Sequence, residues 1–359
     1  MGPTRIQMQI NPSTFRPLIF LALIACPWLA SCSADPDLVV YVSLDQEFSA
    51  PLIKEFEKET GLKVRAEFDT EANKTVGLSR RLIEEKGNVR CDVYWNNEVA
   101  QTVRLAHLGL LQAYDSPSAV DIPAGFRDPD NRWTGFAARA RIFIVNTELV
   151  PDHSEIDSMW DLIDPKWAGK VGMARPLTGT TLTHAAALYL TIGEEEADRY
   201  LRAIADHQSE GTPPIQVVSS NGQLMRLVRE GVLAWGWTDT DDFNVALLAG
   251  SPVIAIYPDQ KPGPNGEAPL GTFMIPNTIS IPKDAPHLDN AKRFVDWAIS
   301  RKMEERLAHS PSAQIPVRAD VKAPDNVRRD FITMKVSYMA LGQQMQRRVE
   351  TLKNMFLIR

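Results

Sequence analysis

The chain alternates between short apolar runs and helical patterns soon after its N-terminus. Residues 38–42 are apolar and rich in β-branched side chains, which is typical of a buried strand. After a turn at 43–47, the apolar side chains from Phe48 to Phe56 recur at helical spacing and the helix ends at Gly61, and residues 62–68 alternate as a second strand. A strand, a helix and a strand in this order form a right-handed crossover between parallel strands. The pattern therefore predicts an α/β fold.

The alternation continues along the chain. At 359 residues, the chain is too long for one ordinary domain, so we expect two lobes, each a mostly parallel sheet flanked by helices. Further strands are expected at 91–95, 135–146, 171–174, 216–218, 234–238, 252–257 and 277–282. Further helices are expected at 75–85, 182–190, 194–205, 223–229, 289–299, 301–308 and 326–356.

The N-terminus has the pattern of a secretion signal. Residues 15–30 are apolar apart from Arg16, follow Arg5, and contain no acidic residue. The stretch ends in small residues and is too short for a membrane span. We therefore expect a signal peptide over residues 1–31 and a protein that leaves the cytoplasm.

A cysteine at the end of this signal is the expected lipidation site. Leu29-Ala30-Ser31-Cys32 has the order of a bacterial lipobox, in which the cysteine is acylated after cleavage. Cys26 fits the same pattern, but Cys32 leaves a fuller apolar core and begins a polar tether at 32–37. We expect a lipoprotein held at a membrane surface in the periplasm or cell envelope. A plain secreted protein is the alternative.

The charge and the cysteines exclude several classes of protein. Removing residues 1–31 takes away two arginines and no acid, so the formal net charge changes from −6 to −8. This acidic balance does not favour a nucleic-acid partner. Only Cys91 remains besides Cys32, so an internal disulfide framework is excluded, and Cys91 is expected to be a buried small residue.

Polar clusters follow three strands of the first sheet. In parallel sheets the carboxyl ends of the strands share one edge, where ligands bind. Any one cluster is also what a helix cap looks like, because Ser, Asp and Asn are common N-cap residues. Three clusters in register favour a ligand site made of Ser43, Asp45, Glu47, Asp69, Glu71, Asn96, Asn97 and Glu98.

Two hydroxyl-rich helix starts are expected in the second half of the chain. The beginning of a helix offers free backbone N–H groups and the positive end of the helix dipole, which suit an anion. An ordinary hydroxyl cap is the alternative. The candidate anion-binding residues are Thr178, Gly179, Thr180, Thr181, Ser219, Ser220 and Asn221.

The apolar run at 234–237 breaks into Thr238, Asp239, Asp241 and Asp242. Three acids this close repel one another, so a bound cation, a helix N-terminus or surrounding water must offset them. Carboxylates are hard oxygen donors that suit Ca²⁺, Mg²⁺, Mn²⁺ or iron, and they also hold ammonium groups. Asp239, Asp241 and Asp242 are therefore the candidate metal ligands. A solvated turn with a capping Asp is the alternative.

Four segments resemble a known family of proteins. They are Val40-Tyr41-Val42-Ser43, Phe56-Glu57-Lys58-Glu59-Thr60-Gly61-Leu62-Lys63-Val64, Cys91-Asp92-Val93-Tyr94-Trp95 and Asn290-Ala291-Lys292-Arg293-Phe294-Val295-Asp296-Trp297. These are similar to the family 1 extracellular solute-binding proteins of ABC importers, and the likeness covers nearly all of residues 38–318. The closest branch is that of the ferric-ion-binding periplasmic proteins.

The resemblance implies a fold and partners. It implies the type II periplasmic-binding-protein fold, with a ligand cleft between two lobes joined by crossing strands. The implied lobes are 38–134 with 252–300, and 135–251 with 301–359. The resemblance also implies a monomeric receptor that delivers its ligand to a membrane permease with its ATPase.

The chain departs from the ferric branch at one motif. Ferric binders of this branch carry a tyrosine pair after a Thr-Asn element, whereas here Thr238-Asp239-Thr240 is followed by Asp241-Asp242. The helix starts at 178–181 and 219–221 match the places where the family holds an anion or phosphate. We therefore predict a cargo cation of the iron type or another hard metal, with a synergistic anion. An organic cation of the polyamine or thiamine type and a sugar phosphate are the alternatives.

Two other functional classes remain open at this stage. A two-lobed sensor would present a ligand-dependent surface to a receptor, and fold alone does not exclude it. A lipid-anchored hydrolase is not supported, because the chain has no GxSxG, HExxH or Walker A motif. We expect no catalytic residues and no catalytic cofactor. Arg139 and Arg141 are the basic candidates near the expected cleft.

Overall fold

The computed structural model describes residues 2, 35–69, 76–205, 215–263 and 266–357, and residues 36–359 form one compact unit. Cys26, Cys32 and Glu71 lie outside the described residues, as does the expected signal peptide except Gly2. Signal cleavage and lipidation therefore stay predictions.

The strands and helices follow the expected alternation. The strands are β1 (Leu38–Val42), β2 (Val64–Phe68), β3 (Val93–Asn96), β4 (Leu111–Gln112), β5 (Thr134–Asn146), β6 (Val171–Ala174), β7 (Ile215–Val218), β8 (Trp235–Asp239), β9 (Val253–Ile256) and β10 (Met274–Pro282). The helices are α1 (Gln46–Thr60), α2 (Val76–Glu84), α3 (Ala100–His107), α4 (Gly179–Thr191), α5 (Glu194–Ala205), α6 (Asn221–Arg229), α7 (Thr240–Leu248), α8 (Leu288–Ala298), α9 (Arg301–Ala308) and α10 (Tyr338–Phe356).

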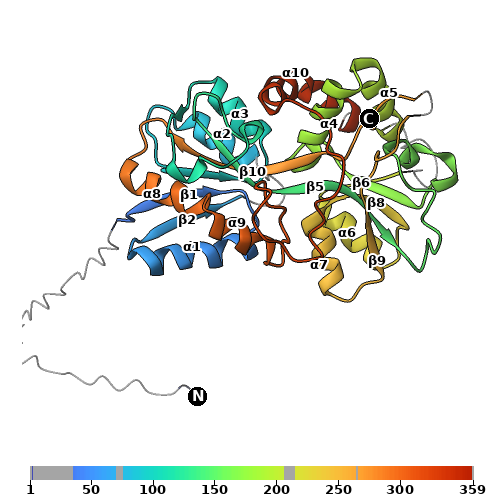
Figure 1. Ribbon diagram of the computed structural model, residues 1–359, viewed down its shortest axis with the longest axis horizontal. Coiled ribbons are helices and arrows are strands. Elements are labelled where there is room, and N and C mark those ends of the chain that lie inside the picture. The colour runs from blue at the N-terminus through green and yellow to red at the C-terminus, as the bar shows by residue number, and fades with distance from the viewer. Residues whose placement is uncertain (1, 3–34, 70–75, 206–214, 264–265, 358–359) are drawn as a thin grey trace, which may run out of the picture. The chain divides into compact units, whose positions relative to one another are not determined.

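The described strands form one sheet in the order β2-β1-β3-β10-β5-β8-β6-β7, with β4 beside β10 and β9 beside β5. The outer trios are parallel, with β1 between β2 and β3 and β6 between β7 and β8. The middle pair, β5 and β10, is antiparallel to its neighbours and runs between the two halves of the sheet (Figure 1). Two mostly parallel lobes joined by crossing strands are thus confirmed.

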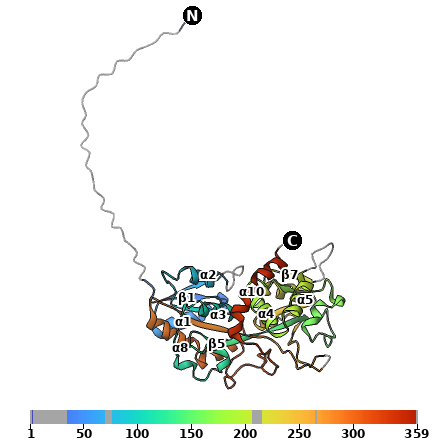
Figure 2. The same cartoon turned by 90° about the horizontal axis from the view of Figure 1, so that it is seen from above.

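Helices cover both faces of the sheet. On one face, a continuous apolar cluster joins residues of α2, α3, α4, α5 and α10. On the other face, α1, α8 and α9 cover the first lobe, while α6 and α7 cover the second. Helix α10 lies across the junction between α3 and α4 (Figure 2). Both faces of β5 are therefore enclosed, which explains why all thirteen of its residues are buried.

A pair of glycines brings α6 close to the part of the sheet that belongs to the second lobe. Gly172 of β6 and Gly236 of β8 are register partners. A Cβ atom on Gly236 would lie 2.2 Å from the carbonyl oxygen of Gly172 and 2.9 Å from the Leu224 side chain on α6. Only glycine fits this approach, and the approach sets the start of α6 beside the carboxyl end of β8.

The lobe boundaries differ from the expectation at two segments. β9 pairs with β5 at Val253–Ile256, alongside the second lobe, because its apolar side chains pack against α7. Helix α9 packs its Met303 and Leu307 into the core of α1 and α8, in the first lobe. The expected division at 252 and 301 is therefore wrong for these two elements.

The expected C-terminal helix over 326–356 is wrong in its first part, because α10 begins at Tyr338. The backbone before it is held by another partner. Thr272 donates its N–H to the carbonyl oxygen of Ile332 and accepts from the N–H of Met334. Pairing with residue 272 is incompatible with the hydrogen bonds of a helix.

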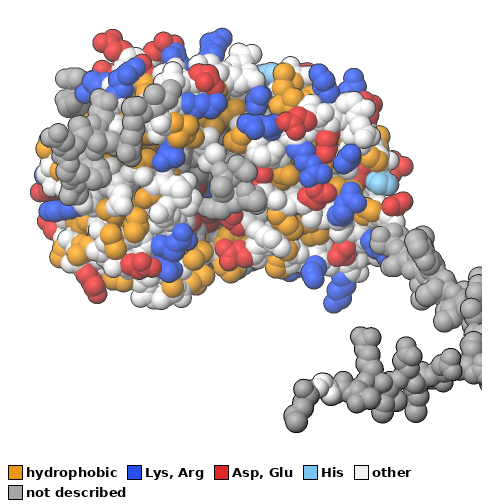
Figure 3. Space-filling view, turned by 180° about the vertical axis from the view of Figure 1, so that it is seen from behind, with side chains coloured by type: hydrophobic (Ala, Val, Ile, Leu, Met, Phe, Trp, Pro, Cys, Tyr) orange, Lys and Arg blue, Asp and Glu red, His pale blue; other side chains and the backbone are white. Residues whose placement is uncertain are grey.

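The surface charge is mixed on one face of the molecule. Basic and acidic side chains are interspersed over the face seen from behind (Figure 3). No described helix has the length and apolarity needed to cross a membrane. Cys91 is buried and free, as expected.

We predict that Gly236→Ala destabilises the fold by about 1–3 kcal/mol, because the added methyl group overlaps the Gly172 carbonyl. Urea unfolding followed by tryptophan fluorescence measures the effect. Gly87→Ala is the matched control, because a Cβ atom there meets nothing within 4 Å. Equal stability of the two variants would contradict the close-packing argument.

Candidate functional site

A cavity of about 370 Å³ lies where the carboxyl ends of β3, β6, β7 and β8 meet the starts of α1, α4, α6 and α7. Both lobes and the crossing strand β5 line it. The predicted residues that line it are Asp45, Glu47, Asn97, Thr178, Gly179, Thr180, Thr181, Ser219, Ser220, Asn221, Asp239, Asp241 and Asp242. The strand ends therefore converge on one cavity as the sequence pattern indicates.

Five predicted residues do not line the cavity. Four of them are Ser43, Asp69, Asn96 and Thr238. Ser43 donates to Asp69 over 2.9 Å, and Asp69 also accepts from the N–H of Leu78. Asn96 donates to Glu98, and Thr238 donates to Asp242 over 2.8 Å. Each of these four side chains forms a hydrogen bond within the protein. They lie outside the lining of the cavity, whereas the sequence analysis expected them in the ligand site.

The fifth, Glu98, is fully buried at the start of α3. Its carboxylate accepts from the N–H groups of Ala100 and Gln101, and from the hydroxyl of Thr183 on α4 over 2.7 Å. Burial raises the pKa of Glu98, and these donors oppose the shift. Glu98 caps α3 and ties the two lobes together, instead of facing the cavity.

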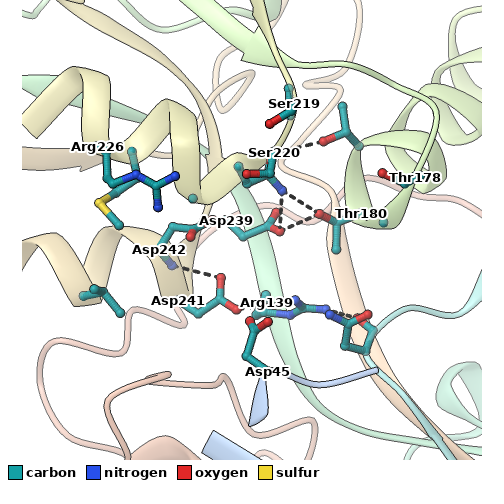
Figure 4. Close-up of a pocket in the computed structure, with 18 of the residues that line it drawn as sticks. Asp45, Arg139, Thr178, Thr180, Ser219, Ser220, Arg226, Asp239, Asp241 and Asp242 are labelled. Carbon is teal, nitrogen blue, oxygen red and sulfur yellow. Dashed lines mark hydrogen bonds and ion pairs between the residues drawn. The ribbon is translucent and has the colours of Figure 1, made fainter. Parts of the chain in front are cut away.

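Two buried ion pairs neutralise two of the three clustered acids. Arg141 donates to Asp239 over 2.8 Å, and Arg139 lies 3.4 Å from Asp241. Arg139 also donates to the carbonyl oxygen of Asn97 in the first lobe. Burial opposes the charge of Arg139, but Asp241 and Asp239 outweigh it, so the pKa of Arg139 is raised. Figure 4 shows Arg139 lying beside Asp241 and Asp45.

Asp239 is ionised in spite of its burial. Burial alone would raise its pKa, but Arg141, Arg139 and the hydroxyl of Thr180 stabilise the carboxylate, and the pKa is lowered. Only 3% of Asp239 is exposed, so no bulk water is available to do this. The cation that the acidic cluster requires is therefore supplied in large part by the protein itself.

Two arginines that the sequence analysis overlooked also line the cavity. Arg175 follows β6 directly, and Arg226 lies on α6. Among the described residues, neither guanidinium has an acidic partner or a hydrogen-bond acceptor, and the Nε of Arg175 is buried without one. The expectation that Arg139 and Arg141 are the only basic candidates is therefore wrong in part: Arg139 lines the cavity, but it is not the only arginine to do so. The position of Arg175 at a strand end was a signal that could have found it.

Arg229 of α6 also lines the cavity, 3.7 Å from Glu230. Arg141, by contrast, is fully buried behind Asp239 and does not line it. Among the described residues, five acids and four arginines thus line the cavity, with the acids Asp45 and Glu47 on the first lobe and Arg175 and Arg226 on the second.

Three helix starts contribute backbone donors. α4 begins at Gly179, where φ is 57°, a left-handed conformation that favours glycine. α6 begins at Asn221 and α7 at Thr240. The first N–H groups of each helix have no partner inside the helix, and the helix dipole adds partial positive charge there. Ser220 already accepts from the N–H of Gln223, and Asp241 from that of Asp242, so the remaining N–H groups of these starts are the ones that suit a negatively charged group.

A metal-type arrangement is also present. One carboxylate oxygen from each of Asp239, Asp241 and Asp242 lies within 4.8 Å of the others. Two of the three carboxylates are paired with arginine, so a metal ion would compete with those pairs. Among the described residues that line the cavity there is no tyrosine, in keeping with the missing tyrosine pair.

Comparison with known proteins decides the family. Residues 51–335 match the family described as bacterial extracellular solute-binding protein. The chain belongs to this family. A relative, "Iron uptake protein A1" of Synechocystis, is 24% identical to this solute-binding protein over 320 residues, covering 84% of this chain and 85% of the relative.

Solved structures share the fold of this solute-binding protein. A ferric binding protein from Campylobacter jejuni has a TM-score of 0.77 at 21% identity, covering 89% of this chain and 99% of that one. A periplasmic binding protein from Actinobacillus pleuropneumoniae with fructose-6-phosphate bound has a TM-score of 0.76 at 23% identity, covering 91% and 100%. The same fold therefore occurs with two chemically different ligands.

We predict that Arg141→Met lowers the free energy of unfolding by about 3–5 kcal/mol at pH 7, because it leaves Asp239 buried and unpaired. In the unaltered protein the pKa of Asp239 is lowered, so the pair stabilises the fold above the usual Asp range and is lost as the pH falls through the lowered pKa. The difference between the two proteins should therefore shrink below about pH 4. Urea unfolding at pH 7, 5 and 3.5 measures it, and a pH-independent difference would contradict the assignment.

Proposed function

We propose that this protein is the solute receptor of an ABC importer and that its ligand is a small organic molecule bearing a phosphate or phosphonate group. The observation that carries the proposal is that Arg175 and Arg226 line the cavity together with the starts of α4 and α6, and that neither arginine has an ion-pair partner within the described part of the chain. Guanidinium groups and helix N-termini are the groups that proteins most often use for phosphate oxygens.

The size of the cavity supports an organic ligand. A volume of about 370 Å³ lies in the range of small-molecule pockets, whereas a bare metal ion with three carboxylates needs far less space. Arg139 supports an anion as well, because it is 2% exposed, lines the cavity and has an Nε without a partner in the described structure.

The first lobe supplies the opposite chemistry. Asp45 and Glu47 lie at the start of α1 and line the cavity across from the arginines. Carboxylates accept hydrogen bonds from the hydroxyl or amino groups that the rest of such a ligand carries. The arrangement therefore supports an organic phosphate over inorganic phosphate. Inorganic phosphate has no hydrogen-bond donor for these carboxylates at neutral pH except its own acidic proton.

A hard metal ion is the second candidate, and it rests on Asp239, Asp241 and Asp242. Metal binding must displace Arg139 or Arg141 from these carboxylates. An organic cation must in addition tolerate Arg175 and Arg226 in the same cavity. The lost ion pairs and the nearby arginines make a metal ion and an organic cation less favourable candidates than an organic phosphate.

We predict that fructose 6-phosphate raises the melting temperature of the purified protein. The compounds to compare with it, each tested separately, are 2-aminoethylphosphonate, inorganic phosphate, ferric citrate, Mn²⁺, putrescine and thiamine. A ligand at one hundred times its Kd adds about 2.7 kcal/mol of stability. Thermal shift identifies the binders and titration calorimetry gives the affinities. A shift with ferric citrate or Mn²⁺ that EDTA abolishes, without any shift for the phosphorus compounds, would favour the metal.

Arginine variants test the same prediction at the level of residues. Arg175→Gln and Arg226→Gln should each weaken binding of the phosphorus compound roughly tenfold or more, because a hydrogen bond to a charged group contributes about 1.5–3 kcal/mol. Arg199→Gln is the matched control, because Arg199 lies on the surface of α5 and pairs with Glu196. An unchanged affinity in both cavity variants contradicts the phosphate assignment.

We also propose that Cys32 is acylated and holds the receptor at the membrane next to its permease. The lipobox order at 29–32 and the polar tether support this. Mass spectrometry of the mature N-terminus should show a diacylglyceryl group on Cys32, and Cys32→Ser should move the protein from the membrane fraction to the soluble fraction. A lipid on Cys26, or an unmodified mature N-terminus, contradicts the assignment.

A further inference from the structure

Four cavity residues form hydrogen bonds with one another through their side chains. Thr180 donates its hydroxyl to Oδ2 of Asp239 over 2.5 Å. The amide of Asn221 donates to the same oxygen over 3.1 Å and to the Thr180 hydroxyl oxygen over 2.9 Å. Thr181 donates to the amide oxygen of Asn221 over 3.1 Å. These bonds join the start of α4 to the start of α6 and to the end of β8. Figure 4 shows the bond between Thr180 and Asp239 as a dashed line.

The carboxylate at the centre of this network has a rigid support. Asp239 ends β8 and is the register partner of Arg141 on β5. Its other oxygen, Oδ1, accepts from Arg141 over 2.8 Å, and Arg141 is fully buried. Oδ1 of Asp239 is thus fixed by Arg141 of the sheet, and Oδ2 accepts hydrogen bonds from the starts of α4 and α6.

The local packing reinforces this geometry. Gly172 and Gly236 allow α6 to lie close to the sheet, so Asn221 reaches the end of β8. Gly179 starts α4 with a left-handed backbone directly before Thr180. The N–H groups of both helix starts therefore border one cavity at a spacing set by Asp239.

We propose that Asp239 is a positioning residue: through Thr180 and Asn221 it sets the spacing at which the starts of α4 and α6 bind one tetrahedral phosphorus group together. The proposal rests on the proposed function for the identity of that group. Thr180, Thr181 and Asn221 then act on the ligand through the placement of backbone N–H groups, while Arg175 and Arg226 contact it.

The test compares variants of Thr180 in the full chain with fructose 6-phosphate as the probe. Thr180→Val keeps the shape and removes the donor, and should weaken binding roughly tenfold or more. Thr180→Ser keeps the hydroxyl and should restore most of that affinity. The ³¹P shift of the bound probe should move towards the free value in Thr180→Val and stay near that of the unaltered complex in Thr180→Ser. Thr191→Val, at the other end of α4, is the matched control, because its hydroxyl bonds only within α4 and to Met334.

A double-variant cycle separates positioning from direct contact. Thr180 and Asn221 share Asp239, so Thr180→Val combined with Asn221→Ala should lose little more affinity than the larger single loss. Losses that multiply, or a Thr180→Val protein that binds as tightly as the unaltered chain, overturn the positioning role. Failure of the unaltered chain to bind any phosphorus compound instead overturns the proposed function, so the two failures are distinct.

Discussion

The buried ion pair between Arg141 and Asp239 is the interaction on which the cavity depends. Asp239 ends a buried strand and has almost no exposure to water, so an unpaired charge there would be strongly unfavourable. Arg141 supplies the compensating charge from the neighbouring strand. Because the carboxylate stays ionised, it accepts hydrogen bonds from the starts of two helices and holds them at the edge of the cavity.

The crossing strand β5 supplies this charge for a geometric reason. Residues 139 and 141 are two positions apart, so their side chains leave the strand on the same face. Arg141 meets Asp239, while Arg139 meets Asp241 and reaches the backbone of Asn97 in the other lobe. One strand therefore neutralises the acidic cluster and also links the lobes across the cavity.

The fold does not choose the ligand. Solved proteins with this fold are described with iron and with fructose-6-phosphate, at sequence identities to this chain below 25%. The choice falls to a few side chains at the shared edge of the sheets. Within the described part of this chain, Asp239 and Asp241 pair with arginines, whereas Arg175 and Arg226 form no ion pair. Two of the three acids at 239–242 are therefore compensated by the protein's own arginines, although the acidic run in isolation points towards a cation.

The sequence alone determined the alternation of strands and helices, a long crossing strand at 135–146, which the structure extends by one residue, and the polar strand ends, because these follow from periodicity along the chain. It placed Asp45, Asn97 and Asp239 at one edge because the ends of parallel strands meet there. It could not tell that Ser43 and Glu98 turn to other partners, since the choice between two nearby acceptors depends on distances in space. Only the tertiary structure brought Arg226 to the cavity and placed Arg141 behind Asp239, because both positions depend on contacts between elements that are remote in sequence.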